Sequence, residues 1–180
     1  MAFPGIDQLR TLITPIAQRH GLDVEDIKVT RAGKKSVVGI RLDADNHPDL
    51  DLLEVVSQEV SALLDAAEDR GEINLGAGYT LEVSTPGVDT PLTAPRHWRR
   101  NRHRLVSLEG QTWRIGALND AEDEVVLVRT VKKQPEMRVW QLDETVPAVV
   151  EIEFAKAPEA ELELTGLDSE QANAWREDNK

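Results

Sequence analysis

Two stretches of the chain repeat apolar residues at the spacing of an α-helix. Residues 6–17 and 52–64 carry apolar side chains three and four positions apart. That spacing places the apolar side chains on one face of a helix, where they can pack against another layer. Pro15 lies inside the first stretch and should kink the helix or begin a new first turn, because proline has no backbone N–H.

Three short stretches between and after these helices are rich in β-branched residues or alternate between apolar and polar ones. Residues 24–29 and 37–42 flank a charged turn and predict a hairpin, and residues 79–84 predict a third strand. The predicted order is helix, strand, strand, helix, strand, in which two helices cover one face of a three-stranded sheet. We therefore expect a two-layer α/β domain over residues 1–90.

Three prolines within ten residues follow the third predicted strand, at positions 86, 91 and 95. Each removes a backbone donor and stiffens the chain. They predict a semi-rigid stretch at about 86–96, in which we place the domain linker at 91–96.

The hydrophobic period changes to two beyond this linker. Five short strand-like segments follow in close succession, which is typical of a small β-barrel. We expect this barrel over residues 97–156, giving an α+β two-domain protein. Residues 157–180 are acidic and poor in large apolar side chains, so they predict a flexible tail or at most a frayed helix. The five predicted strands are 104–108, 112–118, 124–130, 138–142 and 149–154.

The net charge of −12 is spread unevenly along the chain. Residues 1–95 carry a net −8, residues 96–156 a net +1 and residues 157–180 a net −5. Such a chain repels nucleic acid at long range and attracts a basic partner protein. The same charge could instead serve solubility alone, as in many acidic cytoplasmic proteins.

Several classes of chemistry lack their residues in this sequence. There is no cysteine, so disulfides, thiolate metal sites and cysteine nucleophiles are excluded. No nucleotide-binding, zinc-protease or serine-hydrolase motif occurs, and the four histidines lack metal-site spacing. We expect no catalytic site, metal, cofactor or small-molecule substrate. No signal peptide or apolar run long enough for a membrane is recognised, so we expect a cytoplasmic protein without a membrane partner.

Four carboxylates crowd between two predicted strands, at Asp120, Glu122, Asp123 and Glu124. Oxygen ligands of this kind could serve a divalent metal, but the spacing and glycine of a calcium loop are missing. A solvated hairpin tip is the favoured interpretation.

The stretch from Arg96 to Arg104 is the strongest departure from the acidic composition. Arginine binds phosphate through two parallel hydrogen bonds, and tryptophan can stack on a base. Contact with RNA is one interpretation, and pairing with the acidic first domain or simple solvation of the first barrel strand are the others. The candidate contact residues are Arg96, Trp98, Arg99, Arg100, Arg102 and Arg104.

The block Leu81-Glu82-Val83-Ser84-Thr85-Pro86-Gly87-Val88-Asp89-Thr90-Pro91-Leu92, with the following His97-Trp98-Arg99-Arg100, resembles the signature of the ribosome maturation factor RimP family. Thr90 stands where that family usually has arginine, and His103 where glycine is common. The signature positions are Glu82, Ser84, Pro86, Gly87, Asp89 and Pro91.

The resemblance implies both a fold and a function. The fold would be a two-helix, three-stranded N-terminal domain with an SH3-like (Sm-like) C-terminal barrel. The function would be non-enzymatic assembly of the small (30S) ribosomal subunit through transient binding to the immature particle. Family members associate with the basic small-subunit ribosomal protein numbered twelve, and nearby rRNA is a further expected contact.

Two alternatives remain open from the sequence. A free-standing RNA-binding module would use the barrel and the Arg96–Arg104 segment and bind RNA without a protein partner. A metal-dependent hydrolase would use the Asp120–Glu124 cluster, although it lacks a positioned nucleophile, base or ligand set.

Overall fold

The computed structural model describes residues 3–87 and 90–180, and the chain divides into two compact units between Pro86 and Gly87. The first unit combines two helices with a three-stranded sheet, and the second contains a five-stranded antiparallel sheet. The predicted α+β two-domain class is therefore confirmed.

The division between the units lies earlier than the predicted linker at 91–96. Leu92 is buried in the core of the second unit, and its N–H donates to the carbonyl of Ala148 at 2.8 Å. Pro95 begins a helix, where the missing N–H of proline leaves no hydrogen bond unmade. Residues 91–96 thus belong to the second unit and do not form a separate linker.

The first unit has the predicted element order and sheet. β1 and β2 form an antiparallel hairpin, and β3 pairs parallel with β2, which gives the sheet order β1-β2-β3. A parallel pair needs a crossover, and α2 supplies it between β2 and β3. The elements are α1 (Ile6–Arg19), β1 (Asp23–Ala32), β2 (Lys35–Asp43), α2 (Leu50–Asp69) and β3 (Tyr79–Ser84).

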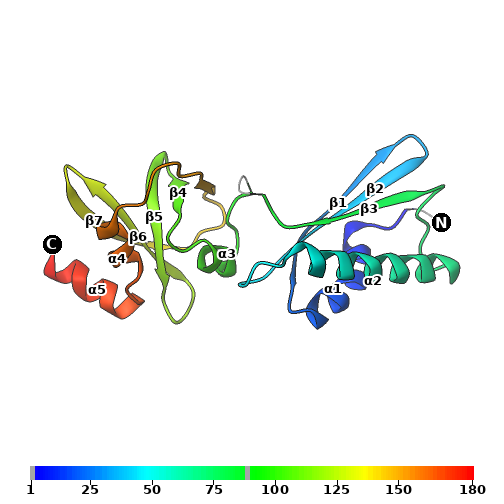
Figure 1. Cartoon of the computed structure of the whole chain (residues 1–180), viewed down its shortest axis with the longest axis horizontal. Helices are drawn as coiled ribbons and strands as arrows, with labels where there is room; N and C mark the ends of the chain where they lie inside the picture. Colours follow the sequence, from blue (N-terminus) through cyan, green and yellow to red (C-terminus); the bar gives the residue numbers. More distant parts are fainter. Residues whose placement is uncertain (1–2, 88–89) are drawn as a thin grey trace. The chain divides into compact units, whose positions relative to one another are not determined.

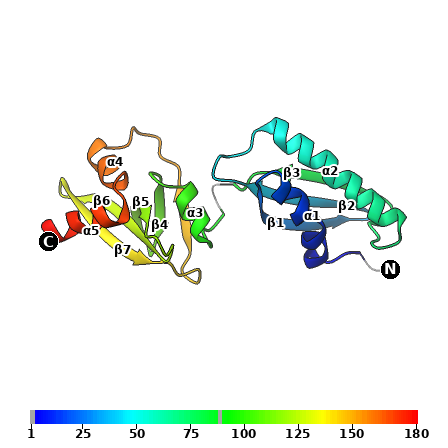
Figure 2. The same ribbon diagram turned by 90° about the horizontal axis from the view of Figure 1, so that it is seen from below.

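Both helices cover the same face of this sheet (Figure 1 and Figure 2). Side chains along β2 alternate between buried and more exposed positions, which is the period of a strand. The inward side chains pack against the apolar faces of α1 and α2, whereas Arg41 and Glu82 are exposed. The core members at its centre are Leu9, Ile13, Val38, Ile40, Val56, Val60 and Leu64.

The first helix runs through Pro15 without ending there. α1 is continuous to Arg19, and the hydroxyl of Thr14 donates to the carbonyl of Arg10 at 2.6 Å. The helix ends at His20, and Gly21 follows with φ +69°, a left-handed conformation that glycine adopts at little cost.

The second unit is built on one antiparallel sheet of order β7-β6-β5-β4-β8. The five predicted strands are present, although closure into an SH3-like barrel stays a prediction. The elements are α3 (Pro95–Arg100), β4 (Leu105–Leu108), β5 (Gln111–Leu118), β6 (Glu124–Val131), β7 (Gln134–Gln141), β8 (Ala148–Glu151), α4 (Glu159–Thr165) and α5 (Ser169–Asp178).

The second sheet is covered on both faces along β6. Four consecutive residues of β6 are buried, and they alternate between two apolar clusters. Val125 and Leu127 join the cluster that contains Trp98 and Trp140, whereas Val126 and Val128 pack with residues of α4 and α5. A strand that is buried on both sides reads as a continuous apolar run, as this one does.

The expected flexible tail at 157–180 is wrong. These residues form α4 and α5 (Figure 1). Leu164 and Ala172 of these helices are buried in one cluster with Val128 and Met137. Asp168 and Gln171 make a reciprocal capping box that fixes the start of α5. Few apolar side chains suffice here because the second face of β6 supplies the other half of the cluster.

We predict that Leu164→Ala destabilises the protein by about 2–4 kcal/mol, because it removes a buried side chain from a small cluster. Chemical denaturation followed by tryptophan fluorescence measures this loss. Leu50→Ala is the control, because Leu50 is 83% exposed. Equal stability of the two variants would contradict the packing of α4 against the sheet.

Candidate partner-binding site

The arginine-rich segment forms the short helix α3 and the turn that leads into β4. The His97 ring closes the start of α3, where its Nδ1 accepts the N–H groups of Thr93 and Ala94 at 3.0 and 3.1 Å. Asn101 closes the other end, and its side-chain amide donates to the carbonyl of His97 at 2.8 Å. Part of this segment is therefore used to build the second unit itself.

Trp98 does not lie on the surface as an RNA-stacking residue would. Its side chain is 3% exposed, and its ring lies 5.4 Å from that of Trp140 at an angle of 46°. Tilted aromatic pairs at this distance stabilise cores. The expected role of Trp98 in stacking on a base is wrong, and its role is to fill the core.

Arg102 is also directed inward. Its Nε donates to the carbonyl of Thr165 at 2.7 Å, and its Nη2 donates to that of Leu167 at 2.8 Å. Carbonyls at the end of a helix lack partners within the helix, and a cation there offsets the helix dipole. Arg102 therefore closes the C-terminal end of α4, and it is removed from the candidate contact residues.

Four of the six predicted contact residues remain candidates for a partner. Arg99 is exposed, and its Nη1 pairs with Glu122 Oε1 of the β5–β6 hairpin at 3.0 Å. Arg104 is exposed and donates to Asn101 Oδ1 at 3.2 Å, while Arg96 and Arg100 are half-buried. A surface ion pair such as that of Arg99 is weak and can be exchanged for a phosphate. The segment thus offers a small cationic surface without an aromatic platform.

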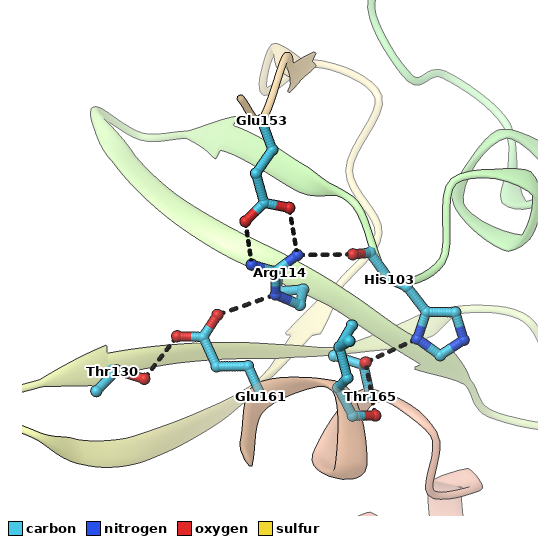
Figure 3. Close-up of polar contacts among 7 residues, drawn as sticks. His103, Arg114, Thr130, Glu153, Glu161 and Thr165 are labelled. Atoms are coloured by element: carbon cyan, nitrogen blue, oxygen red, sulfur yellow. Dashed lines mark hydrogen bonds and ion pairs between the residues drawn. The ribbon is translucent and has the colours of Figure 1, made fainter. Parts of the chain in front are cut away.

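The strongest polar arrangement of the second unit centres on Arg114 of β5, which is 1% exposed (Figure 3). Its Nη1 and Nη2 donate to the two carboxylate oxygens of Glu153 at 2.9 and 2.6 Å, and its Nε donates to Glu161 at 2.9 Å. Nη1 also donates to the carbonyl of His103 at 2.8 Å. Glu161 accepts in addition the hydroxyl of Thr130. Four separate segments of the unit are therefore joined at one guanidinium.

The contact between Arg114 and Glu153 favours the ionised form of both groups. The hydrogen bond to Glu153 is the largest of the effects that raise the pKa of Arg114, and burial opposes it. The same hydrogen bond lowers the pKa of Glu153 below its ordinary value. A buried cation with two carboxylates has its hydrogen bonds satisfied, which is the condition for burying charge at tolerable cost.

His103 bridges this cluster and the end of α4. Its backbone has φ 78°, and its Nδ1 lies 2.8 Å from the hydroxyl of Thr165. The left-handed conformation explains why glycine suits this position in the resembling family. Burial, with smaller effects of Arg102 and Arg114, lowers the pKa of His103, so the ring is neutral near pH 7.

The described signature positions, in β3 and the stretch that follows it, lie mainly on the surface. Glu82 and Ser84 are exposed on β3, Gly87 and Pro91 are exposed after it, and Pro86 is half-buried. Asp89 lies outside the described residues. The inward residues of β3 pack on the core, whereas Glu82 and Ser84 contribute little to it.

Neither a metal-binding group nor a membrane-spanning helix is found within the described ranges. Over residues 3–87 and 90–180, no group of three or more potential ligands could hold a metal ion. None of the helices described there is both long and apolar enough to span a bilayer.

The acidic stretch Asn119–Asp123 forms a hairpin tip, in which Asn119 Oδ1 accepts hydrogen bonds from the backbone N–H groups of Asp123 and Glu124.

Comparison with known proteins decides the family. A protein from Corynebacterium diphtheriae named ribosome maturation factor RimP is 52% identical over 184 residues, covering 100% of both chains. The chain belongs to the RimP family. Relatives of the same name from Corynebacterium aurimucosum and Corynebacterium kroppenstedtii are 52% and 42% identical, covering 99% and 95% of this chain and 100% and 99% of their own.

The RimP N-terminal domain model matches residues 12–89, which spans most of the first unit. The predicted family is thus confirmed, and RimP relatives cover the second unit as well. The Arg114 cluster was not predicted from the sequence. A single arginine inside the otherwise apolar strand 113–117 was the available signal, because a buried cation requires a partner.

We predict that Arg114→Ala destabilises the protein by about 3–5 kcal/mol, because it leaves Glu161 buried without its cation. Arg99→Ala is the matched control and should cost about 0–1 kcal/mol, because both partners of that pair are largely exposed. Urea denaturation of the two variants measures the difference. An Arg114→Ala protein as stable as Arg99→Ala would show that the cluster contributes nothing to stability.

We predict that the free energy of unfolding of Glu153→Gln falls less steeply than that of the wild type as the pH is lowered. Because the folded-state pKa of Glu153 is lowered, its ionisation stabilises the protein above its unfolded pKa of about 4.3. This contribution is lost as the pH falls through the folded value. Thermal unfolding between about pH 3 and pH 7 measures the profile, and Glu144→Gln at an exposed turn is the control.

Proposed function

We propose that this chain is a ribosome maturation factor that assists assembly of the small (30S) subunit without catalysing a reaction. It binds the immature subunit transiently, contacts the basic ribosomal protein numbered twelve, and then leaves. The observation that carries the proposal is the full-length similarity to proteins named ribosome maturation factor RimP. It acts in the cytoplasm, where subunits are assembled.

The charge of the first unit supports a basic protein partner. Residues 1–86 carry a net −7, and α2 exposes acidic side chains along its length. The last turn of α2 contains no basic residue, so its carboxylates add to the negative end of the helix dipole. A basic partner is attracted to this end, and complementary charge speeds the encounter. The exposed acidic residues of α2 are Asp51, Glu54, Asp65 and Asp69.

The second unit supports a local contact with rRNA. Arg96, Arg99, Arg100 and Arg104 concentrate positive charge around α3, within a chain that is otherwise acidic. Guanidinium groups bind phosphates through paired hydrogen bonds. Burial of Trp98 removes the aromatic contact on which a free-standing RNA-binding module would depend. Binding to RNA is therefore secondary to binding of the protein.

We predict that Glu54→Lys combined with Asp69→Lys weakens binding to the basic ribosomal protein by about tenfold, because it reverses charge on the surface of α2. The combined variant Glu170→Lys and Asp178→Lys makes the same change in net charge on α5 and is the matched control. Calorimetric titration at roughly 50 mM and roughly 300 mM salt measures the affinities, and added salt should weaken the wild-type complex.

Equal weakening by both charge reversals would show that net charge, and not the surface of α2, attracts the partner. Salt-insensitive binding would contradict the electrostatic argument, and no binding at all would contradict the partner. A strain that lacks this chain should accumulate free immature small subunits, and normal subunit assembly in that strain would contradict the function itself.

A further inference from the structure

Two large apolar side chains are exposed on the segment that follows β8. Phe154 is 94% exposed and Ile152 is 62% exposed, and Phe154 has the highest value among large apolar side chains of the described residues. They lie two positions apart in chain that is neither helix nor strand. A single exposed leucine is ordinary on a protein surface. A neighbouring isoleucine and phenylalanine form an apolar patch, and such patches mark interaction sites.

The alternate residues of the same segment are fixed to the domain. Glu151 accepts the hydroxyl of Thr112 at 3.3 and 3.4 Å, and Glu153 accepts two hydrogen bonds from the buried Arg114. Successive side chains of an extended chain point to opposite sides. With Glu151 and Glu153 directed toward β5, Ile152 and Phe154 are directed to solvent, as their exposure shows.

This arrangement prepares the segment for binding. Folding already fixes its backbone through the contacts of Glu151 and Glu153, so little chain entropy remains to be lost when a partner binds. Phenylalanine also has few rotatable bonds and a large apolar surface. Phe154 therefore belongs to the aromatic residues that are enriched in the cores of interfaces, and Ile152 adds apolar area beside it.

The surrounding charge indicates the class of partner. Residues 151–163 contain five glutamates and one lysine, and Arg114 pairs with two of the five. An acidic segment repels nucleic-acid phosphates and the identical segment of a second copy. It favours a basic protein.

We propose that Ile152 and Phe154 form a docking motif that inserts into an apolar pocket on a basic protein surface. The inference rests on the proposed function, and it gives the second unit its own contact with the basic ribosomal protein. The acidic surface of α2 attracts the partner, and the apolar motif retains it. Attraction acts mainly on the association rate, whereas burial of an aromatic side chain acts mainly on dissociation.

The test compares the full-length chain with the combined variant Ile152→Thr and Phe154→Ser. The probes are the purified ribosomal protein numbered twelve and purified immature small subunits. We expect affinity for both to fall about tenfold or more, mainly through faster dissociation, because a buried aromatic contact is lost. Thermal unfolding should be unchanged, because neither side chain is buried.

Two matched variants define the role of the motif. Val131→Ser removes a side chain that is 40% exposed at the end of β6, outside both proposed contacts, and should leave binding unchanged. Phe154→Tyr keeps the aromatic ring and should retain most of the affinity. Loss of binding in the combined variant with retention in these two supports the docking motif.

Three results would overturn the inference. The combined variant could bind both probes as well as the wild type, it could lose affinity only for RNA, or it could abolish a dimer of the wild-type chain. Each leaves the proposed function standing, because the wild-type chain still binds its probes. If the wild-type chain bound neither probe, the proposed function and the docking motif would fall together.

Discussion

The second unit depends on one buried guanidinium and the two carboxylates that balance it. Arg114 is almost fully buried, and a lone cation there would be prohibitively costly. Glu153 and Glu161 remove this cost, but only if the segments that carry them lie against β5. Because both carboxylates must reach Arg114, the need for charge balance fixes the positions of two segments. These are the segment after β8 and the helix α4.

This constraint links the fold to the two proposed contacts. Arg102 and His103 belong to the basic segment, yet both make hydrogen bonds to the end of α4 at Thr165. The basic segment is therefore held by the end of α4, a helix that also packs on β6. Glu153, on the other side of the cluster, fixes the segment that exposes Phe154. One set of polar contacts supports both the cationic surface and the apolar motif.

Most of the fold could be predicted from periodicity, because each helix and strand of the first unit has an apolar face that is visible locally. Leu9, Ile13 and Ile16 show α1 directly, and Val38, Ile40 and Leu42 show β2. The C-terminal helices could not be predicted in this way. Leu164 and Ala172 are too few to reveal a core, since Val126 and Val128 of β6 supply the rest.

The candidate site was less predictable because the contacts that fix its residues come from distant parts of the chain. Trp98 and Arg102 have the composition of an RNA contact, and only the tertiary structure shows that they face inward. Arg114 lies 39 residues before Glu153 and 47 before Glu161 in the chain. Since a chain is synthesised from its N-terminus, Arg114 emerges from the translating ribosome long before its counter-ions. The first unit can fold while the second still lacks Glu153 and Glu161, so the second unit can bury Arg114 with both counter-ions only after Glu161 has been synthesised.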